Sequence, residues 1–583
     1  MRYLRMLTNS AIAGGLAAGY LLVVMLQLNP QYPVEAAAVT PLALMLGAAY
    51  GLNVTAIFYG LIVLRQILAV EVLSPGWLSV RLMSWLFTIA SAGGASIMWL
   101  NLRGFRPVLD VETARRMAAG AIVVTAAGAV FLMIALAHIN RRGGRPSATI
   151  LVVTALTSVF MPIVLRGPSR QTAVPPRIEL PAPAEAPTGG RLVLVMLDGA
   201  SLDVITPAVA EGRLPNFGRI LDGGAVVHLA TLRPTQAEPV WSAVATGRTP
   251  MQTGVRSSAS YRVLGVTPAI SLLPDYSFAQ ALVRFGFLWE EPHTAEDLMA
   301  RPLWQILSDQ GVSVGVIGWP LTHPAAPVQG YLVSDRFHRM GGAEIDIDGT
   351  SAIWPPSALE AAKASLKVPP DPDPVSVLSV AGQPPLGDYD LASDPEPVSA
   401  DRVHATLLDA FAALEPRFVA VRFPGIDAVG HYFLRYANPS PFGDVSDDER
   451  RRYGRVLEQY YGFLDTHVGR LINGLGPEDV FLVVSGFGME PMSPSKRVLE
   501  RLVGNAAISG SHERAPDGFL LAYGSPVQPG RLARASILDV TPTILYFFGL
   551  PAGRDMDGFT RTELFRSSFT EERPVSYIPS YGR

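Results

Sequence analysis

The sequence predicts an all-α membrane-spanning bundle followed by an α/β domain, in which a mostly parallel sheet is flanked by helices. Two observations lead to this prediction. Five long apolar runs lie within the first 166 residues, and after residue 190 short runs rich in β-branched and aromatic residues alternate with helical patterns. Residues 167–190, rich in Pro and Ala, separate the two blocks, and we expect them to form a semi-extended linker.

The apolar runs are long enough to cross a bilayer. They cover residues 11–28, 37–64, 82–100, 117–137 and 148–165 and contain almost no charged residue, and a transmembrane helix needs about 20 mostly apolar residues. We expect the second and longest run to tilt or break near Gly51. Because four further runs follow the first, it is not a removable signal peptide. Residues 1–166 are therefore predicted to form a five-span transmembrane region whose partner is the lipid bilayer.

Basic residues in short loops predict the orientation of the spans. Arg2 and Arg5 precede the first run. Three more arginines lie between the fourth and fifth runs: Arg141, Arg142 and Arg145. Both places are expected on the cytoplasmic side, so the fifth span would deliver the rest of the chain to the extracytoplasmic side. Four arginines between the third and fourth runs point the other way: Arg103, Arg106, Arg115 and Arg116.

Composition excludes some classes of function. The chain carries 47 Lys and Arg against 50 Asp and Glu, a formal net charge of −3, which predicts no nucleic-acid partner. It contains no cysteine, so disulfides and thiolate metal sites are excluded.

The globular block, residues 191–583, alternates strands with helices. Strands are expected at residues 191–197, 312–319, 417–423 and 480–486. A helix–turn–helix pattern follows the first strand, and a helical pattern precedes each of the others. Continuous apolar strands separated by helices are typical of a parallel sheet covered on both faces. Pro-rich segments at about 256–300 and 340–400 break the alternation, and we expect them to form an inserted cap over the site.

Carboxylates and histidines follow several of these strands. Asp198 comes directly after the first strand, and Asp427 and His431 follow the third, four residues apart, so they can face one point from one helical turn. His512 lies in a later loop. Sites in open α/β sheets form beyond the carboxyl ends of the strands, and carboxylate with imidazole suits zinc or another divalent metal. Alone, Asp198 is also compatible with a helix cap, and His512 with a surface loop.

A short helix is expected within RPTQAEPVWSAVATGRTP, residues 233–250, where a proline begins it and Gly247 ends it. A helix N-terminus offers free N–H groups and a partial positive charge, which suit a phosphate or sulfate.

As a set, these segments resemble the alkaline phosphatase superfamily, and within it the type I phosphodiesterase and nucleotide pyrophosphatase group. The matching stretches are LDG at 197–199, LPNFGRIL at 214–221, EPVWSAVATGRTP from 238, GIDAVGHYF at 425–433, SGFG at 485–488, SHERAPDGF at 511–519 and SILDVTPTILYFFGLPAGRDMDG at 536–558. The resemblance implies an alkaline-phosphatase-like fold for residues 191–583. It also implies hydrolysis of phosphate esters or diesters with two divalent metals, a Thr or Ser nucleophile and a phosphoryl-enzyme intermediate.

The family's site residues carry over in part. Asp427, His431 and His512 match the three ligands of one metal, and Asp198 matches one ligand of the other. The resemblance therefore predicts a divalent ion, with zinc as the first choice and one ion rather than two.

Three groups around the second metal are missing. The family has Asp and His in a Ser-Asp-His-Gly loop, where this chain has Gly486 and Phe487. The family's nucleophile stands two residues before the helix proline, where this chain has Ala237. The VVSGFGME loop at 483–490 thus resembles the family's loop without its ligands.

Three nearby residues are candidate replacements: Thr235 as nucleophile, and Glu238 and Glu490 as ligands. Thr235 also fits a turn hydroxyl, Glu238 a favourable charge at a helix N-terminus, and Glu490 a solvated loop charge.

Three functions remain open. The first is a membrane-anchored, metal-dependent phosphoric ester hydrolase of the phosphodiesterase or phosphatase type with a rebuilt site. The second is a degenerate pseudoenzyme that binds a phosphorylated ligand without turnover. The third is a transferase that moves phosphorylated head groups between lipids and glycans. The expected ligand is a phosphorylated small molecule or a lipid head group.

Overall fold

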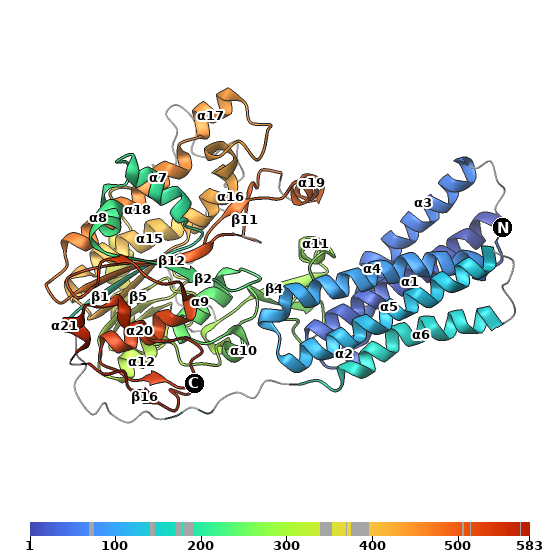
Figure 1. Cartoon of the computed structure of the whole chain (residues 1–583), viewed down its shortest axis with the longest axis horizontal. Coiled ribbons are helices and arrows are strands. Elements are labelled where there is room, and N and C mark those ends of the chain that lie inside the picture. Colours follow the sequence, from blue (N-terminus) through green and yellow to red (C-terminus); the bar gives the residue numbers. More distant parts are fainter. Residues whose placement is uncertain are drawn as a thin grey trace. The chain divides into compact units, whose positions relative to one another are not determined.

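The computed structural model describes residues 1–68, 75–139, 146–170, 176, 178, 190–266, 268–338, 352–368, 370–374, 396–503, 506–512, 515–571 and 573–583. The chain divides into two compact units, which are described separately (Figure 1). Unit 1 contains Met1–Ala173 and Ala259–Pro292, and unit 2 contains Val174–Ser258 and His293–Arg583. Most of the predicted linker, much of the predicted insertion at about 340–400, and the arginines at 141, 142 and 145 lie outside the described residues.

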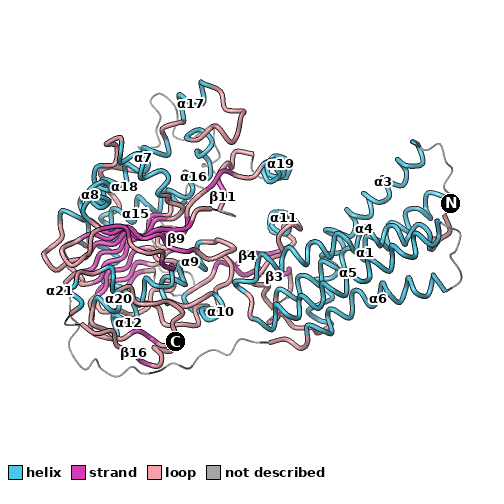
Figure 2. The backbone as a smooth tube through the Cα atoms, viewed as in Figure 1, coloured by secondary structure: helices cyan, strands magenta, loops and turns pink. Residues whose placement is uncertain are grey.

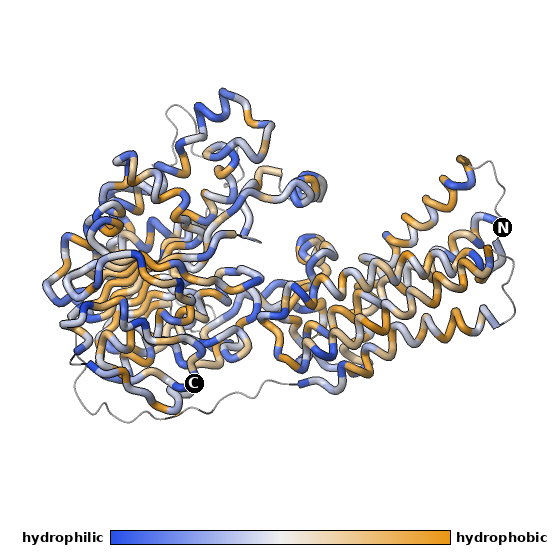
Figure 3. Tube along the Cα trace, viewed as in Figure 1, coloured by the Kyte–Doolittle hydropathy of each residue, from blue (hydrophilic) through white to orange (hydrophobic). Residues whose placement is uncertain are grey.

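Unit 1 contains five helices long and apolar enough to cross a membrane among its described residues. They are formed by α1 (Arg2–Leu28), α2 (Ala36–Leu46) continued by the π-helix η1 (Gly47–Gly51) and α3 (Leu52–Leu68), α4 (Val80–Phe105) with the 3-10 turn η2 (Arg106–Val108), α5 (Val111–Ile139), and α6 (Pro146–Arg166). Apolar residues dominate all of them (Figure 3). The π-helical turn at Gly47–Gly51 confirms the irregularity predicted for the second run.

Two arginines close the helix ends at one end of this bundle. Arg166, the last residue of α6, donates to the carbonyl oxygens of Leu26 at 2.6 Å and Asn29 at 2.8 Å, both at the end of α1. Arg116 in turn donates to the carbonyl oxygen of Arg166 at 2.5 Å and pairs with Glu112 at 2.8 Å. The last carbonyls of a helix lack intrahelical partners and carry partial negative charge. Arg116, one of the loop arginines that departs from the orientation rule, therefore serves as a helix cap.

Residues 259–292 belong to unit 1 rather than to the sheet domain. They form an antiparallel hairpin of β3 (Ala259–Val263) and β4 (Leu288–Pro292), joined through a loop and the short helix α11 (Ala279–Arg284). This segment covers most of the insertion predicted at about 256–300. Its role as a cap over the site stays a prediction.

Unit 2 is built on a mixed sheet of ten described strands, flanked by helices (Figure 2). The central strands β9 (Val480–Phe487), β1 (Leu192–Leu197), β8 (Phe418–Phe423), β5 (Val314–Ile317) and β6 (Gly330–Val333) are parallel neighbours in this order. On one side, β12 (Asp517–Tyr523) pairs antiparallel with β9 and with β2 (Ala225–Ala230), and on the other β7 (Ile353–Trp354) pairs antiparallel with β6. The short strands β13 (Gly530–Arg531) and β14 (Ala535–Ser536) extend the β2 edge. The predicted fold class and the four predicted strands are confirmed.

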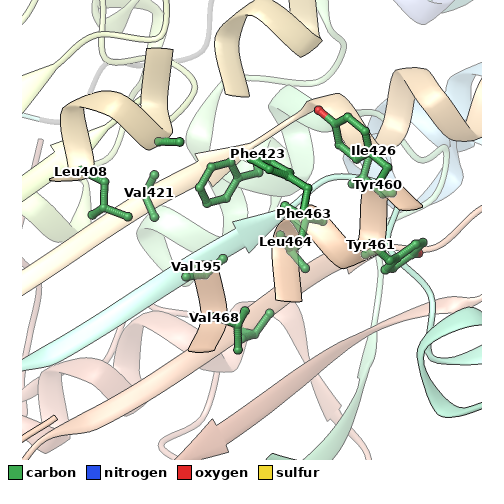
Figure 4. Packing of buried hydrophobic residues seen from close by; sticks show 14 of the residues in the cluster. Val195, Leu408, Val421, Phe423, Ile426, Tyr460, Tyr461, Phe463, Leu464 and Val468 are labelled. Atoms are coloured by element: carbon green, nitrogen blue, oxygen red, sulfur yellow. The ribbon is translucent and has the colours of Figure 1, made fainter. Parts of the chain in front are cut away.

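Helices cover both faces of the sheet. Alternate residues of β1 enter two different cores, Val193 and Val195 on one face and Leu194 and Met196 on the other. On the first face lie α7 (Leu202–Ala210), α8 (Pro215–Gly223), α15 (Glu396–Ala410), α16 (Gly425–Ala437) and α18 (Val456–Asn473). Figure 4 shows Phe463, Leu464 and Val468 of α18 packed beside Val195 of β1 and Phe423 of β8. On the second face lie α9 (Ala237–Thr246), α12 (Leu303–Asp309) and α20 (Val540–Phe547).

Smaller elements complete unit 2. They are the helices α10 (Pro250–Thr253), α13 (Leu359–Ser365), α17 (Asp447–Tyr453), α19 (Pro494–Val503) and α21 (Ser567–Thr570), and the short pairs β10 (Glu490–Pro491) with β11 (Gly510–Ser511) and β15 (Ala552–Gly553) with β16 (Tyr577–Ile578).

Candidate functional site

The first part of the site comes from α16, which begins just beyond β8. The N–H of Gly425, its first residue, donates to the buried carboxylate of Asp401 at 3.0 Å, and the hydroxyl of Tyr460 donates to the same carboxylate at 2.6 Å. These bonds fix the start of the helix against the core. Asp427 and His431 lie one turn apart on α16, as their spacing predicted.

His512 joins them from the loop after β11. Its Nε2 lies 3.1 Å from Nε2 of His431 and 2.7 Å from Oδ1 of Asp427. Nε2 of His431 lies 3.6 Å from Oδ2 of Asp427. One ligand atom from each residue therefore lies within 4.8 Å of the other two. Within the described residues, this is the group of His and carboxylate side chains arranged to hold a metal ion.

Backbone carbonyls orient both imidazoles. Nδ1 of His431 bonds to the carbonyl oxygen of Gly510 and Nδ1 of His512 to that of Gly488, each at 2.9 Å. A carbonyl only accepts, so both Nδ1 atoms carry a proton, and in the neutral imidazole each Nε2 is left with a lone pair. This is the tautomer that a metal-bound histidine adopts.

The arrangement of these atoms fits a cation. In the neutral imidazoles the two Nε2 lone pairs lie 3.1 Å apart, and the carboxylate of Asp427 lies 2.7 Å from Nε2 of His512 and 3.6 Å from Nε2 of His431. Zinc–nitrogen bonds of 2.0–2.1 Å in tetrahedral geometry place two nitrogens about 3.3 Å apart, close to the observed 3.1 Å. Burial alone would raise the pKa of Asp427, but the positive charges that His512 and His431 carry when protonated lower it to about 2. The three residues are compatible with a divalent ion.

Asp198 lies next to this group but is engaged by another partner. It follows β1, and its carboxylate accepts three hydrogen bonds from Arg422 of β8, at 3.2, 3.1 and 2.5 Å, and one from Nε1 of Trp241 at 2.7 Å. Gly199 follows with φ of +68°, and a Cβ there would lie 2.6 Å from Oδ1 of Asp427. A glycine is therefore required at this place, since it permits both the left-handed turn and the close approach of Asp427.

Arg422 is the functional residue that the sequence reading missed. Its side chain is 15% exposed and that of Asp198 is 3% exposed, so the two form a largely buried ion pair. Burial would lower the pKa of the guanidinium, but Asp198 holds it above its usual value. The available signal was a charged residue near the end of the otherwise apolar strand FVAVRF, at 418–423.

Comparison with known proteins identifies the family. The model of the type I phosphodiesterase/nucleotide pyrophosphatase family matches residues 192–526, more than half of the chain. The chain belongs to this family. The resemblance predicted from the sequence motifs is thereby confirmed.

Two other comparisons add little. Among solved structures, a murine ectonucleotide pyrophosphatase/phosphodiesterase 5, in an inactive form in complex with AMP, is similar at 11% sequence identity. The alignment covers 65% of this chain and 100% of the murine chain, with a TM-score of 0.36. The search of curated proteins found no match.

The loop at the end of β9 carries Gly486 and Phe487, at the positions where the resemblance implies two metal ligands. Ser485, at the end of β9, donates to the carbonyl oxygens of Ala200 at 3.0 Å and Phe487 at 2.8 Å, which ties this loop to the one after β1. A Cβ at Gly486 would lie 2.3 Å from Cγ1 of Val240, so Val240 fills the space of a side chain. The Phe487 ring packs against His512, with centroids 4.7 Å apart and planes at 71°.

Ala237, which the resemblance matches to the family's nucleophile, is the first residue of α9. The hydroxyl of the candidate nucleophile Thr235 donates to the carbonyl oxygen of Leu232 at 2.9 Å, a turn contact. Between them, Gln236 accepts the N–H of Ser258 at 2.7 Å. The described loop thus presents no hydroxyl at the family's position.

The two candidate replacement ligands lie in different places. Burial raises the pKa of Glu238, in the first turn of α9, to about 7, while Arg422 opposes and Asp198 reinforces the shift. The charges of both Arg422 and Asp198 therefore act on the carboxyl group of Glu238. Glu490 lies in β10 opposite Ser511. Within the described residues, neither glutamate joins the metal-binding group of three.

Proposed function

We propose that the chain is a membrane-anchored phosphoric ester hydrolase that uses one divalent ion, with a guanidinium in place of the second. Asp427, His431 and His512 would hold the ion, with zinc as the first choice. The observation that carries the proposal is the convergence of two imidazole nitrogens and a carboxylate oxygen, all within 4.8 Å of one another. An ion bound there would act as a Lewis acid toward a phosphoryl oxygen and toward water.

Arg422 supplies a second positive charge. Two of its nitrogens bind Asp198, and its Nη1 makes no hydrogen bond to a described residue. We assign Nη1 to a non-bridging oxygen of the substrate, because a guanidinium presents donors in a fixed fork and stabilises charge that develops on phosphoryl oxygens.

Glu238 is the assigned proton acceptor. Its pKa of about 7 means that a substantial fraction is ionised at neutral pH and can take a proton from an attacking water. Because Ala237 offers no nucleophile, water attacks phosphorus directly. The new phosphorus–oxygen bond forms as the bond to the leaving alcohol breaks, and the leaving alkoxide takes a proton from solvent. This single displacement differs from the phosphoryl-enzyme route implied by the family resemblance.

A second candidate is a binding protein without turnover. It is favoured by the joint loss of the nucleophile at Ala237 and of two ligands at Gly486 and Phe487. Catalytic groups that act as a unit typically contribute about 10⁴–10⁶ in rate, so activity depends on whether Arg422 and Glu238 replace them.

The extracytoplasmic placement of unit 2 belongs to the same proposal. It is supported by the five apolar helices and by the arginines at 2 and 5 before the first of them. The substrate would be a phosphate ester or diester of a small molecule or a lipid head group.

The test is metal content together with turnover of the full chain in detergent. Samples are exposed to zinc or manganese, freed of unbound ions, and measured by elemental mass spectrometry for the wild type, His512→Ala and, as a matched control, His228→Ala on the solvent side of β2. We expect about one ion per chain, lost only in His512→Ala, as a three-ligand site would require. We also expect ion-dependent hydrolysis of bis(4-nitrophenyl) phosphate.

The other outcomes separate the candidates. No bound ion in excess zinc and manganese would refute the hydrolase proposal. A bound ion without turnover would select the binding protein. Transfer of the phosphoryl group to added glycerol in preference to water would select a transferase.

A further inference from the structure

The segment at residues 259–292 lies within the globular part of the sequence but packs on the helices of unit 1. The side chains of Ala259, Tyr261 and Val263 in β3 alternate inward, and Leu288 of β4 joins them. They share one apolar core with residues of α1 and α2, among them Leu22, Met25, Leu26, Leu42 and Met45. The hairpin is therefore an integral part of the helical unit.

Two buried asparagines fix the segment to helix ends. Asn29, directly after α1, donates to the carbonyl oxygen of Leu272 at 2.8 Å and accepts the N–H groups of Ser271 at 2.8 Å and Leu272 at 2.9 Å. Asn101, near the end of α4, donates to the carbonyl oxygen of Asp275 at 2.9 Å and accepts its N–H at 2.7 Å. The side-chain amide of each asparagine therefore both donates to a backbone carbonyl and accepts a backbone N–H, as the backbone of a neighbouring strand does. These bonds set the position of residues 271–275.

This end of unit 1 corresponds to one boundary of the predicted membrane spans. α1, α4 and α6 end there, and α2 and α5 begin there. Arg166 at the end of α6 bonds to the carbonyl oxygen of Asn29, the same residue that holds the segment. A segment fixed to the ends of membrane spans lies where hydrocarbon gives way to lipid head groups.

The outer side of the segment exposes large apolar side chains beside the charged residues Asp275, Arg284 and Glu290. Six large side chains are between 37% and 81% exposed: Leu264, Tyr276, Phe278, Phe285, Phe287 and Trp289. Tyr276 and Phe278 have φ of +59° and +57°, in the left-handed region that residues with side chains rarely adopt. Ser277 between them is buried. The chain keeps a strained backbone that turns Ser277 inward and two aromatic rings outward.

We propose that these side chains form a membrane-interface rim that inserts into the boundary between head groups and acyl chains of the bilayer. Trp, Tyr and Phe combine an apolar ring with low conformational freedom, and Trp and Tyr are enriched at this depth of membrane proteins. The rim adjoins the ends of the spans, since Asn29 after α1 and Asn101 near the end of α4 hold residues 271–275 of the same segment. It gives the unit a second attachment to the lipid surface, separate from its helices.

The absence of cysteine in the chain makes a direct test possible. Trp289→Cys and, independently, Phe285→Cys are labelled with an environment-sensitive fluorophore in the full chain, reconstituted into phosphatidylcholine vesicles. Matched controls are Ile122→Cys, 58% exposed within α5, and Phe559→Cys, 72% exposed in unit 2. Unchanged thermal unfolding verifies that each variant folds.

The expected result is a depth ordering. Lipids with a spin label high on the acyl chain should quench the labels at 289 and 285 more than lipids labelled near the chain end. The label at 122 should show the reverse order, and the label at 559 should not be quenched. The proposal is overturned if the label at 289 behaves like that at 559. It is also overturned if its emission is blue-shifted but no lipid quenches it, because protein would then cover the rim.

Discussion

Replacement of Arg422 by methionine tests whether a buried guanidinium has replaced the second metal. The variant keeps an aliphatic side chain of similar length but removes three hydrogen bonds to Asp198, at 3.2, 3.1 and 2.5 Å. The carboxylate of Asp198, 3% exposed, would keep only the indole of Trp241. Leaving such a charge unpaired typically costs about 3–5 kcal/mol. At roughly 2 °C per kcal/mol for a large domain, the melting temperature should fall by roughly 6–10 °C.

A double variant separates charge from packing. The double variant Asp198→Asn with Arg422→Met leaves no buried charge unpaired, and the new amide oxygen can still accept a hydrogen bond from Trp241. Most of the stability lost in Arg422→Met should therefore be recovered. Arg213→Met is the control for removal of an ion pair with Glu211 and Glu458 at the surface, where about 1 kcal/mol or less is expected. Thermal unfolding of the full chain in detergent, with chelator, gives all four values. If Arg422→Met melts within about 1 °C of the wild type, Arg422 does not neutralise Asp198 and the reasoning fails.

Three other variants test the remaining assignments. His512→Ala should weaken zinc binding by more than about 100-fold in chelator competition, whereas His228→Ala should not. The double variant Gly486→Asp with Phe487→His should bind no second ion. It should also lose about 1–3 kcal/mol of stability, because the Cβ added at position 486 would lie 2.3 Å from Val240. Adding Val240→Ala should restore the stability. Burial raises the pKa of Glu238 from 4.5 to about 7, so its contribution to stability is complete below pH 4.5 and is lost as the pH rises through 7. Without metal, the free energy of unfolding of Glu238→Gln relative to the wild type should therefore be higher at pH 8 than at pH 4.5, by up to about 3 kcal/mol. The variant should also lose about 10²–10⁴ in turnover. An equal stability difference at both pH values would contradict the raised pKa.

Local sequence patterns predicted most of the fold for identifiable reasons. The four predicted strands are continuous apolar runs that enter the sheet as its buried parallel centre, where both faces need apolar side chains. The spacing of Asp427 and His431 predicted their common direction, because four residues make about one helical turn. The break in the second apolar run followed from the glycines that now bound a π-helical turn.

What the sequence did not predict are pairings between distant segments. Asp198 and Arg422 lie 224 residues apart, and nothing in either local pattern names the other. Asn29 and Asn101 stand out as polar residues at the ends of apolar runs, yet their partners, Leu272 and Asp275, lie in an insertion with no periodic pattern. Such contacts depend on strand register and on where distant segments of the chain cross. The pattern of a single segment does not specify either.

If Arg422 replaces the second metal, as we propose, the local charge stays balanced. The family resemblance implies a divalent ion with two carboxylates, Asp198 and the aspartate lost at Gly486, a group of net charge zero. Arg422 with Asp198 is also neutral, and Val240 fills the space next to Gly486. This accounts for how three groups can be lost together without leaving a buried charge unpaired.

The same accounting predicts which substrate the site prefers. One divalent ion with Asp427 leaves one positive charge, the Arg422–Asp198 pair adds none, and Glu238 cancels that charge when it is ionised. A phosphodiester carries one negative charge near neutral pH and a phosphomonoester close to two, so the monoester exceeds the charge of the site by more than the diester does. The ratio of kcat/KM for bis(4-nitrophenyl) phosphate over 4-nitrophenyl phosphate should therefore exceed one, and Asp198→Asn, which frees the charge of Arg422, should lower that ratio. A preference for the monoester in the wild type would mean that more positive charge faces the substrate than one ion and a paired guanidinium provide.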